Sequence, residues 1–303
     1  MARPKPPEAG APLGRGDDRA SGSRPDAVRM ARCAILRADT EAEGAVSEYP
    51  IPNVSHDLSG QVALVTGCTS GLGWRFARVL AACGARTIVT GRRTERLETL
   101  AEEIRGAGGE CLPLALDMTD RASIRAAVEA GEAAFGTISI LVNNAGIPDA
   151  RRAHRMDDEL VDAVLDTNLR GPWVLSCEIA RRLIAAEQGG RMVNISSIGA
   201  FNYGGNGAAL YSVTKAAVVR MTEALAVEWA RYRINVNAIA PGAFSSEMMD
   251  GMLERMGDIR QHFPRGRVCD PALMDSTLLH LVSPASEAVT GTCVKIDDGQ
   301  GPR

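Results

Sequence analysis

The sequence predicts an α/β fold, a Rossmann-like doubly wound parallel sheet of about seven strands with helices on both faces. From residue 58 onward, short β-branched apolar runs alternate with longer amphipathic stretches. The first run leads directly into a glycine-rich turn, and small or polar residues follow most later runs. Because parallel strands are buried on both faces, their sequences are continuously apolar. Ligands of such sheets bind at the carboxyl ends of the strands, where these turns lie.

Composition limits the kinds of partner that the protein can have. The chain has 303 residues, 45% of them apolar and 23% charged, which is ordinary for a globular protein with a large core. A net charge of -3 gives no reason to expect nucleic acid or an anionic membrane as partner. The seven cysteines show no metal-binding spacing, and no apolar run approaches the ~18 residues of a membrane span. We therefore expect a cytoplasmic protein with reduced thiols, no metal and no membrane contact.

Residues 1–55 differ from the rest of the chain. Residues 1–25 are dense in Pro, Gly, Arg and Asp and have few large apolar side chains, so we expect them to be disordered. Residues 31–49 have the composition of a short helix. A dispensable extension, a functional tail and a later start at Met30 all remain open. The expected organisation is therefore an N-terminal extension, 1–55, and a single Rossmann-fold domain, 56–303.

The glycine-rich turn is the first candidate binding site. Residues 61–66 form a predicted strand, Gly67, Gly71 and Gly73 follow it, and a helix is expected over 74–83. Glycines let backbone N–H groups approach a pyrophosphate, and a helix N-terminus favours its negative charge. This order of strand, turn and helix predicts a dinucleotide site.

The end of the second predicted strand, 87–90, bears on the choice of cofactor. An acid at this point would bind the 2′-hydroxyl of NAD, whereas an Arg accommodates the 2′-phosphate of NADP. The strand is followed by Gly91, Arg92 and Arg93, with no acid. NADP is therefore favoured over NAD, with Arg92 as the main contact. The alternative is that both Arg residues are solvated charges at a helix start.

Two further strand ends carry polar or small residues. After residues 111–116, Asp117 is placed to accept a hydrogen bond from the adenine amino group, and Asp120 to cap the next helix. After residues 138–142 comes the turn Asn143-Asn-Ala-Gly146. Its small residues allow a cofactor to approach closely, and its Asn side chains can pin neighbouring strands.

The last polar positions predict proton-transfer chemistry. Tyr211 and Lys215 share one helix face, where the ammonium would lower the phenol pKa and make a general acid or base. Taken alone, this pair is better explained as part of an exposed helix with a snorkelling Lys. Ser197 follows a predicted strand over 192–195. Asn168 is a polar residue on an otherwise apolar helix over 158–182, so its amide needs a partner.

Six motifs in order resemble the short-chain dehydrogenase/reductase family, over residues 58–300. They are Thr66-Gly-Cys-Thr-Ser-Gly-Leu-Gly73, Asn143-Asn-Ala-Gly146, Asn168, Asn194-Ile-Ser-Ser197, Tyr211-x-x-x-Lys215 and Asn237-Ala-Ile-Ala-Pro-Gly242. The resemblance implies a catalytic set. Tyr211 would be the proton donor and acceptor, and Lys215 would lower its pKa and hold the nicotinamide ribose. Ser197 would hydrogen-bond the reacting oxygen. Asn168 would hold a water that links Lys215 to solvent.

The resemblance also implies the cofactor contacts. They are Gly67, Thr69, Ser70, Gly71, Leu72, Gly73, Arg92, Asp117, Met118, Asn144, Ala145, Gly146, Tyr211, Lys215, Pro241, Gly242, Phe244 and Ser246. Three of these contact positions depart from the family pattern. Ser70 stands where NADP-preferring members often carry a base. Phe244 and Ser246 replace the usual β-branched aliphatic residue and Thr.

The implied activity is NAD(P)(H)-dependent interconversion of a ketone or 3-oxoacyl group and a secondary alcohol. Within it, a 3-oxoacyl-thioester reductase and a dehydrogenase of a small cyclic or aromatic alcohol both remain open. A protein of a different class is the alternative: a catalytically inactive dinucleotide-binding sensor or scaffold, which would not need the four catalytic residues.

Substrate choice is expected to lie in a lid over 244–267 and in the basic loop that follows Gly146. The lid carries four Met residues suited to an adaptable wall, although ordinary helix packing would also explain them. The loop could attract an anionic substrate or be plainly solvated. Family members usually form homo-oligomers through the helices of Asn168 and Tyr211, so we expect a tetramer or dimer. The apolar stretch 216–229 fits this, or fits a core.

Overall fold

The computed structural model describes residues 49–205 and 207–301. The expectations of disorder over 1–25 and of a helix near 31–49 concern residues outside these ranges, apart from Tyr49, and remain predictions. Asn53–Arg303 forms one compact unit.

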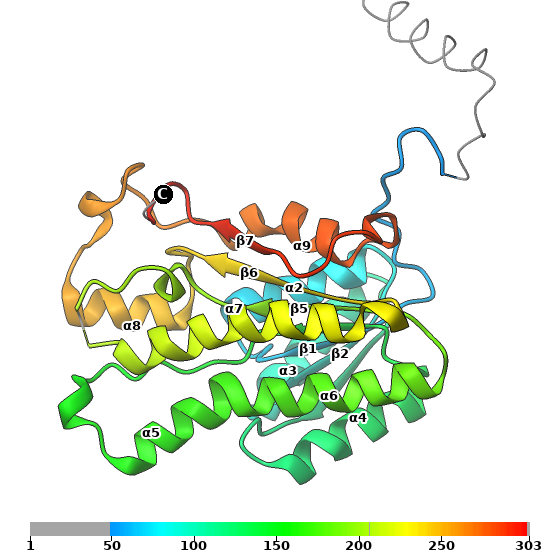
Figure 1. Cartoon of the computed structure of the whole chain (residues 1–303), viewed down its shortest axis with the longest axis horizontal. Coiled ribbons are helices and arrows are strands. Elements are labelled where there is room, and N and C mark those ends of the chain that lie inside the picture. Colours follow the sequence, from blue (N-terminus) through cyan, green and yellow to red (C-terminus); the bar gives the residue numbers. More distant parts are fainter. Residues whose placement is uncertain (1–48, 206, 302–303) are drawn as a thin grey trace, which may run out of the picture. The chain divides into compact units, whose positions relative to one another are not determined.

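A parallel sheet is the centre of that unit (Figure 1). Within the described residues it has seven strands in the order β3-β2-β1-β4-β5-β6-β7, and every pairing is parallel. The strands are β1 (Val62–Thr66), β2 (Arg86–Gly91), β3 (Cys111–Ala115), β4 (Ile140–Asn143), β5 (Gly190–Ile195), β6 (Ile234–Pro241) and β7 (Cys293–Ile296). The strand order reverses between β1 and β4, which is where a doubly wound sheet forms its ligand crevice. The predicted fold class is confirmed.

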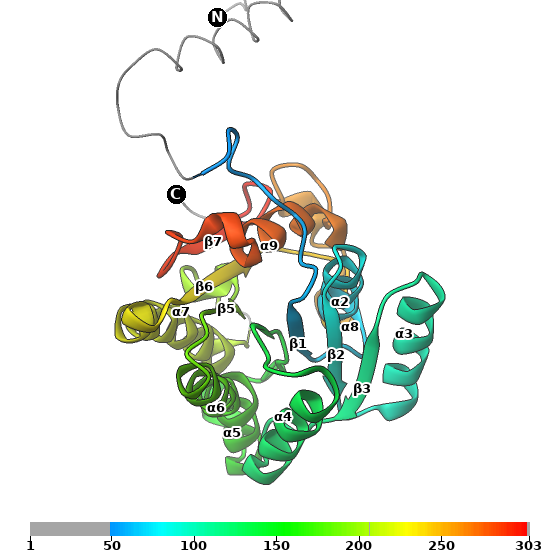
Figure 2. The same cartoon turned by 90° about the vertical axis from the view of Figure 1, so that its right-hand side faces the viewer.

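Helices cover both faces of the sheet (Figure 2). The main helices are α2 (Gly71–Ala82), α3 (Thr94–Gly106), α4 (Arg121–Phe135), α5 (Asp158–Leu165), α6 (Gly171–Ala185), α7 (Ala209–Trp229), α8 (Glu247–Met256) and α9 (Asp275–Val282). One buried cluster joins α2, α3 and α9 to the sheet, and a second joins α4, α6 and α7 to it. The predicted single helix over 158–182 is instead interrupted by a π-helical turn, Asp166–Arg170, which separates α5 from α6.

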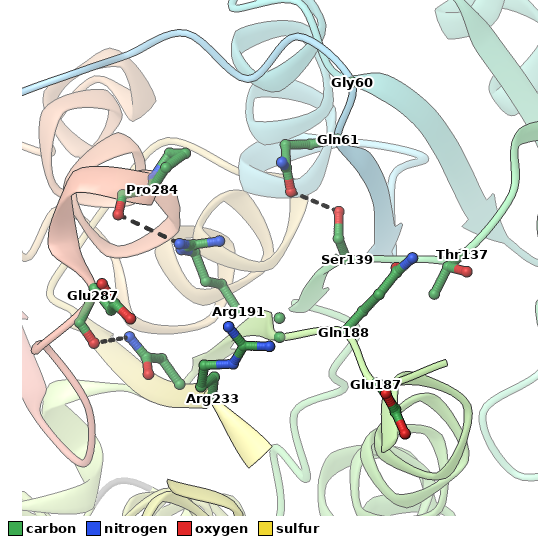
Figure 3. Close-up of a pocket in the computed structure, with 13 residues that line it drawn as sticks. Gly60, Gln61, Thr137, Ser139, Glu187, Gln188, Arg191, Arg233, Pro284 and Glu287 are labelled. Atoms are coloured by element: carbon green, nitrogen blue, oxygen red, sulfur yellow. Dashed lines mark hydrogen bonds between the residues drawn. The ribbon is translucent and has the colours of Figure 1, made fainter. Parts of the chain in front are cut away.

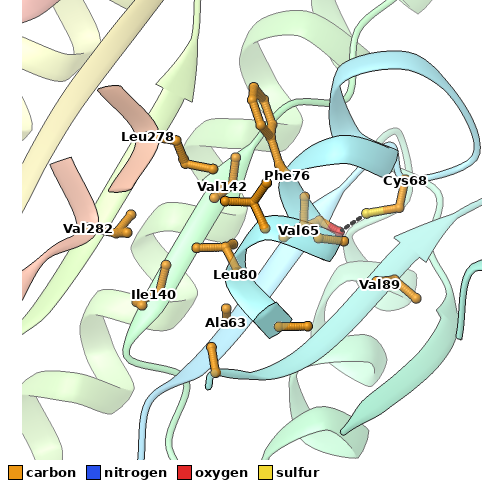
Figure 4. Close-up of a cluster of buried hydrophobic side chains, with 14 of the residues drawn as sticks. Ala63, Val65, Cys68, Phe76, Leu80, Val89, Ile140, Val142, Leu278 and Val282 are labelled. Carbon is orange, nitrogen blue, oxygen red and sulfur yellow. Dashed lines mark hydrogen bonds between the residues drawn. The ribbon is translucent and has the colours of Figure 1, made fainter. Parts of the chain in front are cut away.

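The strands divide their side chains between these two clusters. Ala63 and Val65 of β1 belong to the first cluster and Leu64 to the second, because successive residues of a strand point to opposite faces. Figure 4 shows the first cluster, in which Phe76 and Leu80 of α2 lie against the strands, both with 0% exposure. The sheet is thus sealed on both sides, and only its strand ends are open to a ligand.

The helices and cysteines of the described residues bear on membrane contact and on disulfide bonds. None of their helices is both long enough and apolar enough to cross a membrane. The six cysteines among them are free thiols, and three of these are buried.

Candidate active site

The turns after β1 and β4 are locked together at the carboxyl edge of the sheet. The Thr66 hydroxyl accepts hydrogen bonds from the backbone N–H groups of Asn144 and Ala145, both at 3.0 Å. In return, the Asn144 amide donates to the carbonyl oxygens of Thr66 and Gly67, at 2.9 and 3.1 Å. The predicted role of these Asn side chains in joining neighbouring strands is confirmed for this turn. Asn143 does the same deeper in the sheet, donating to Asn194 at 2.8 Å.

This contact leaves no room for a side chain at Gly67 or Gly73. A Cβ atom on Gly73 would lie 2.3 Å from the Gly67 carbonyl oxygen and 2.5 Å from the Asn144 amide nitrogen. A Cβ on Gly67 would lie 2.8 Å from the Ala145 Cα. Gly67 and Gly71 also have φ values of +69° and +56°, which favour glycine. The turn therefore presents bare backbone at the crevice between β1 and β4.

The start of α2 completes a cradle for a phosphate group. Its N-cap residue, Ser70, makes no side-chain capping bond, and its first turn carries no acidic residue. The first N–H groups of this helix have no intrahelical partner, and the helix dipole favours an anion beside them. The cradle fits the pyrophosphate of a dinucleotide, whose charge and oxygens would satisfy these groups.

The strand ends beside the cradle carry the two residues predicted to meet the adenosine. Arg92 is exposed, at the end of β2. Asp117, after β3, accepts from the backbone N–H and the hydroxyl of Thr119, at 2.9 and 2.8 Å. These hydrogen bonds, with a smaller contribution from the Arg92 charge, hold the pKa of Asp117 below its usual value. Asp120 caps α4 by accepting from the Ala122 N–H at 2.8 Å, as predicted.

Arg93 contacts the glycine-rich turn more directly than the sequence suggested. Its guanidinium donates to the Thr69 hydroxyl at 2.7 Å and to the Glu247 carboxylate at 2.8 Å. Mainly because of this bond, the pKa of Glu247 is lowered. No motif signalled the contact, since Glu247 lies 154 residues further along the chain and begins the helix α8.

Asn168 sits on the π-helical turn and is 1% exposed. Its amide oxygen accepts from the Ile147 N–H at 2.8 Å, and its amide nitrogen donates to the Ile147 carbonyl at 2.9 Å and to the Thr214 hydroxyl at 3.3 Å. The expected need for a partner is therefore met by the loop after β4 and by α7. π-Turns within helices are frequent at functional sites, where they re-aim a side chain.

Lys215 is buried next to Asn168, with 4% exposure. Its ammonium donates to the Ile195 carbonyl at the end of β5, at 2.8 Å. A Cβ on Gly146 would lie 3.4 Å from both the Asn168 amide oxygen and the Lys215 Nζ, so these three residues meet at one point. Burial lowers the pKa of Lys215 to about 8 because it disfavours the charged form.

Ser197 and Tyr211 face each other across the crevice. The Ser197 hydroxyl is hydrogen-bonded to the Tyr211 side chain and also accepts from the Gly199 N–H, at 3.1 Å. The neighbouring Ser196 is 2% exposed and donates to the Lys215 carbonyl at 2.8 Å, so its hydroxyl is engaged away from the phenol. The choice of Ser197 over Ser196 therefore agrees with the geometry.

The expectation that Lys215 lowers the pKa of Tyr211 is wrong: the protein raises it. Burial raises the pKa of Tyr211, the hydrogen bond from Ser197 opposes that rise, and the Asp149 charge adds to it. Lys215 Nζ lies 5.5 Å from the centre of the Tyr211 ring and is hydrogen-bonded to a carbonyl. The phenol is thus held protonated, as a proton donor must be.

The turn after β6 is fixed by a residue that the sequence did not single out. The Gln300 side-chain oxygen accepts from the Ala243 N–H at 2.7 Å, and a Cβ on Gly242 would lie 2.6 Å from that oxygen. Pro241 is the last residue of β6, and Ser246 caps α8.

Two predicted cofactor residues have side chains in the core. Phe244 is 3% exposed and belongs to the first buried cluster, and Met118 is 6% exposed and belongs to the second. The ring of Phe244, which replaces the usual β-branched aliphatic residue, fills the core. Because both side chains are buried, only the backbone atoms of these residues are left to meet a cofactor. The same holds in part for Ala145, which packs against the second cluster, and for Leu72, which packs against the first.

The predicted lid is a lightly buried helix. No residue of α8 is buried, and Met248 and Met256 are 38% and 45% exposed. Met249 and Leu253 line a cavity of about 350 Å³ with Arg260 and Arg267. In the basic loop, Arg151 pairs with Asp157 at 2.7 Å and Arg152 donates to the Gly205 carbonyl at 3.0 Å, so these two charges are already engaged.

A larger cavity of about 510 Å³ lies at the opposite, amino-terminal edge of the sheet (Figure 3). Its polar side chains mostly bind one another or the backbone. Arg191 donates to the Ser283 carbonyl at 3.0 Å, and the Ser139 hydroxyl donates to Gln61 at 2.8 Å. Ser197 and Tyr211 do not line this cavity, so it is not part of the candidate site. Across the described residues, no group of three acidic, His or Cys side chains is placed to hold a metal ion.

Comparison with known proteins agrees with this arrangement. A family model described as short chain dehydrogenase matches residues 61–256. The chain is 37% identical over 246 residues to a 2-dehydro-3-deoxy-D-gluconate 5-dehydrogenase of Dickeya dadantii, covering 80% of this chain and 96% of that protein. It is 35% identical to a 3-oxoacyl-(acyl-carrier-protein) reductase of Thermotoga maritima, covering 80% and 98%. A crystal structure of a gluconate 5-dehydrogenase from Burkholderia cenocepacia in complex with NADP and tartrate superposes with a TM-score of 0.77 at 32% identity, covering 82% and 98%.

The close packing of the glycine-rich turn leads to a prediction about stability. Gly73→Ala should lower the free energy of unfolding by about 1–3 kcal/mol, because the new methyl overlaps backbone at Gly67. The matched control is Gly106→Ala in α3, where nothing lies within 4 Å of the added Cβ. Urea unfolding followed by circular dichroism measures both variants. Equal stability of the two variants would contradict the tight packing.

Proposed function

Because the chain belongs to the short-chain dehydrogenase/reductase family, we propose that its reaction is carried by Tyr211, Ser197, Lys215 and Asn168. As a member it is an NAD(P)-dependent oxidoreductase that interconverts a carbonyl group and an alcohol. Nothing in the structure or the relatives favours the idle sensor or scaffold, and an idle binding protein would need no such set of side chains.

The observation that carries the proposal is the meeting of four polar side chains from three separate elements. Tyr211 and Lys215 come from α7, Ser197 from the end of β5, and Asn168 from the π-turn. A bound nicotinamide would supply or accept the hydride. In the reductive direction, Tyr211 gives its proton to the substrate oxygen as charge develops there, and Ser197 donates a hydrogen bond to the same oxygen. The raised pKa of Tyr211 suits this donor role.

Lys215 and Asn168 support that proton transfer. The buried ammonium of Lys215 sits one helical turn beyond Tyr211 and stabilises negative charge that forms on the phenol. Asn168 borders the Lys215 ammonium at Gly146 and so can order a water that returns a proton to the site. The same ammonium is placed to bind a ribose hydroxyl of the cofactor.

The cofactor is proposed to be NADP. The cradle formed by Gly67, Gly71 and Gly73 would bind the pyrophosphate, and Arg92 the 2′-phosphate. Support comes from the absence of an acid at the end of β2 and from the NADP bound in the gluconate 5-dehydrogenase crystal structure. Asp117 would bind the adenine, and the turns at Asn144 and at Gly242 would bind the nicotinamide side.

The substrate is proposed to be a small molecule with a ketone or a secondary alcohol. The relatives named above include a sugar-acid dehydrogenase and a 3-oxoacyl reductase. A panel containing keto sugar acids, 3-oxoacyl thioesters and cyclic or aromatic ketones, each with NADPH and NADH, separates these classes. We place the enzyme in the cytoplasm, where thiols such as its free cysteines stay reduced.

Removal of the Tyr211 hydroxyl tests the catalytic assignment. Tyr211→Phe should reduce turnover at least about 10²-fold while leaving NADPH affinity close to wild type, because only the proton donor is lost. Tyr232→Phe is the control, since that residue lies in the 3-10 turn after α7, away from the crevice. Turnover is measured by cofactor absorbance. An active Tyr211→Phe enzyme would rule out the assignment.

Truncation of Arg92 tests the choice of cofactor. Arg92→Ala should weaken NADPH binding by about tenfold or more, because a charge-assisted hydrogen bond contributes about 1.5–3 kcal/mol, and should leave NADH binding unchanged. Arg231→Ala, which removes an Arg stacked on Tyr232, is the control. Calorimetric titration with each cofactor gives the affinities. Unchanged NADPH affinity in Arg92→Ala would exclude its contact with the 2′-phosphate.

A homo-oligomer is proposed from the outer surface of α6 and α7. Val218, Met221, Leu225 and Trp229 are buried in the core, so much of the apolar stretch 216–229 is explained without a partner. Three large apolar side chains nevertheless stay exposed on this side: Trp173 at 46%, Val213 at 62% and Val227 at 81%. A second copy of the chain packed on this surface would cover them.

A charge on that surface tests the oligomer. The wild-type protein should elute as a dimer or tetramer at micromolar concentration, and Val227→Glu should shift it to a smaller species, because a buried unpaired carboxylate is costly. The control is Leu273→Glu, at a residue that is 50% exposed near α9 on the other face. Light scattering after gel filtration gives the masses. A wild-type monomer would contradict the proposal.

A further inference from the structure

Asp149 lies beneath the start of the helix that carries Tyr211. It belongs to the loop between β4 and α5 and is 3% exposed. One carboxylate oxygen accepts from the backbone N–H groups of Leu210 and Tyr211, at 2.9 and 3.2 Å, and the other accepts from the Ala150 N–H at 2.9 Å. The formal N-cap of α7, Ala208, has no side chain able to cap. A carboxylate 61 residues away in the chain therefore does the capping.

Further contacts tie the same two segments together just after Asp149. Arg151 and Ala208 form an isolated parallel β-bridge, and Arg152 donates to the Gly205 carbonyl at 3.0 Å. The loop after β4 thus holds the loop before Tyr211 at three points. Since the loop after β4 also carries the turn proposed to meet the nicotinamide, these contacts fix Tyr211 relative to the cofactor side of the crevice.

The Asp149 charge is not neutralised by an ion pair in the described part of the chain. The neighbouring cations are engaged elsewhere, because Arg151 pairs with Asp157 and Arg152 binds a backbone carbonyl. Among the described residues, the Tyr211 side chain is hydrogen-bonded to Ser197, and Lys215 Nζ lies 5.5 Å from the ring centre. A buried carboxylate at this point opposes ionisation of the phenol, because like charges repel strongly where water is excluded.

We propose that Asp149 is a positioning residue for Tyr211: its buried carboxylate fixes the first turn of α7 and places a negative charge, unpaired among the described residues, beside the phenol. This inference rests on the proposed role of Tyr211 as the acid and base. Burial, and after it the Asp149 charge, raise the pKa of Tyr211. Asp149 does not touch the substrate oxygen in this scheme, and it acts only on Tyr211 and the first turn of α7.

Two substitutions separate the charge from the hydrogen bonds. Asp149→Asn keeps an oxygen that can accept from the Leu210 and Tyr211 N–H groups but removes the charge, whereas Asp149→Ala removes both. The matched control is Asp120→Asn, at another Asp that caps a helix, α4, through a backbone N–H. Each protein is studied as the full chain, with kcat and kcat/KM for alcohol oxidation measured against pH.

Oxidation requires the phenolate, so its rate rises with pH through the pKa of Tyr211. Asp149→Asn should move this rise to lower pH by about 0.5–1 unit, because removing a negative charge eases ionisation. Asp149→Ala should show the shift together with at least a roughly tenfold loss in kcat, because the first turn of α7 loses its cap. Asp120→Asn should keep the wild-type profile.

A second measurement follows the phenol without turnover. Ultraviolet difference titration of each protein against its Tyr211→Phe counterpart gives the ionisation of Tyr211 directly, and the same downward shift is expected in Asp149→Asn. A wild-type profile and titration in Asp149→Asn would overturn the inference, whatever the effect of Asp149→Ala on folding. If Tyr211→Phe is inactive in that case, the proposed function stands and only the role of Asp149 fails. If Tyr211→Phe is active, the proposed function fails first.

Discussion

The site depends on the contact between the turn after β1 and the turn after β4. Thr66 and Asn144 exchange hydrogen bonds across the point where the strand order reverses, at 2.9–3.0 Å. That contact brings the backbones so close that Gly67 and Gly73 admit no side chain. The phosphate cradle is on one side of it, and on the other the chain continues to Gly146, where Lys215 and Asn168 meet. One set of hydrogen bonds therefore sets the spacing between the proposed phosphate cradle and the proposed acid–base groups.

Burial then gives each polar group of the site a defined state. An amide or ammonium removed from water is costly unless it is hydrogen-bonded, so Asn168 is held by Ile147 and Lys215 by the Ile195 carbonyl. These bonds leave the side chains few alternative orientations. The same exclusion of water raises the pKa of Tyr211 and lowers that of Lys215, which keeps the phenol protonated and the ammonium easier to discharge. Positioning and proton affinity thus share one physical origin.

The sequence predicted the fold, and placed the candidate site residues at strand ends, turns and helix starts, because these are local patterns. Tyr211, Ser197 and the glycine-rich turn all lie at such points, and the structure brings the first two into contact. Contacts between distant segments leave no local pattern, and these were missed: Asp149 beneath α7, Arg93 on Glu247, and Gln300 against Ala243. The π-turn at Asp166–Arg170 was missed because its sequence continues a helical pattern. The Tyr211 pKa had the wrong direction because Lys215 was weighed without burial.

The predicted lid, unlike the buried residues of the candidate site, is held by partly exposed ion pairs. Its helix, α8, has no buried residue, and ion pairs anchor the segment at both ends: Arg93 with Glu247, and Arg267 with Asp298. The Arg93 and Glu247 side chains are each about half exposed, and such pairs contribute little to stability. Asp298 is more constrained, with a φ of 53° and a side chain only 9% exposed. The proposed acid–base residues are therefore held by buried hydrogen bonds, whereas the proposed lid is held by weak contacts at its ends. Relatives that share the acid–base residues can differ in substrate by changing the lid alone, which is consistent with the different substrates in the names of the two relatives.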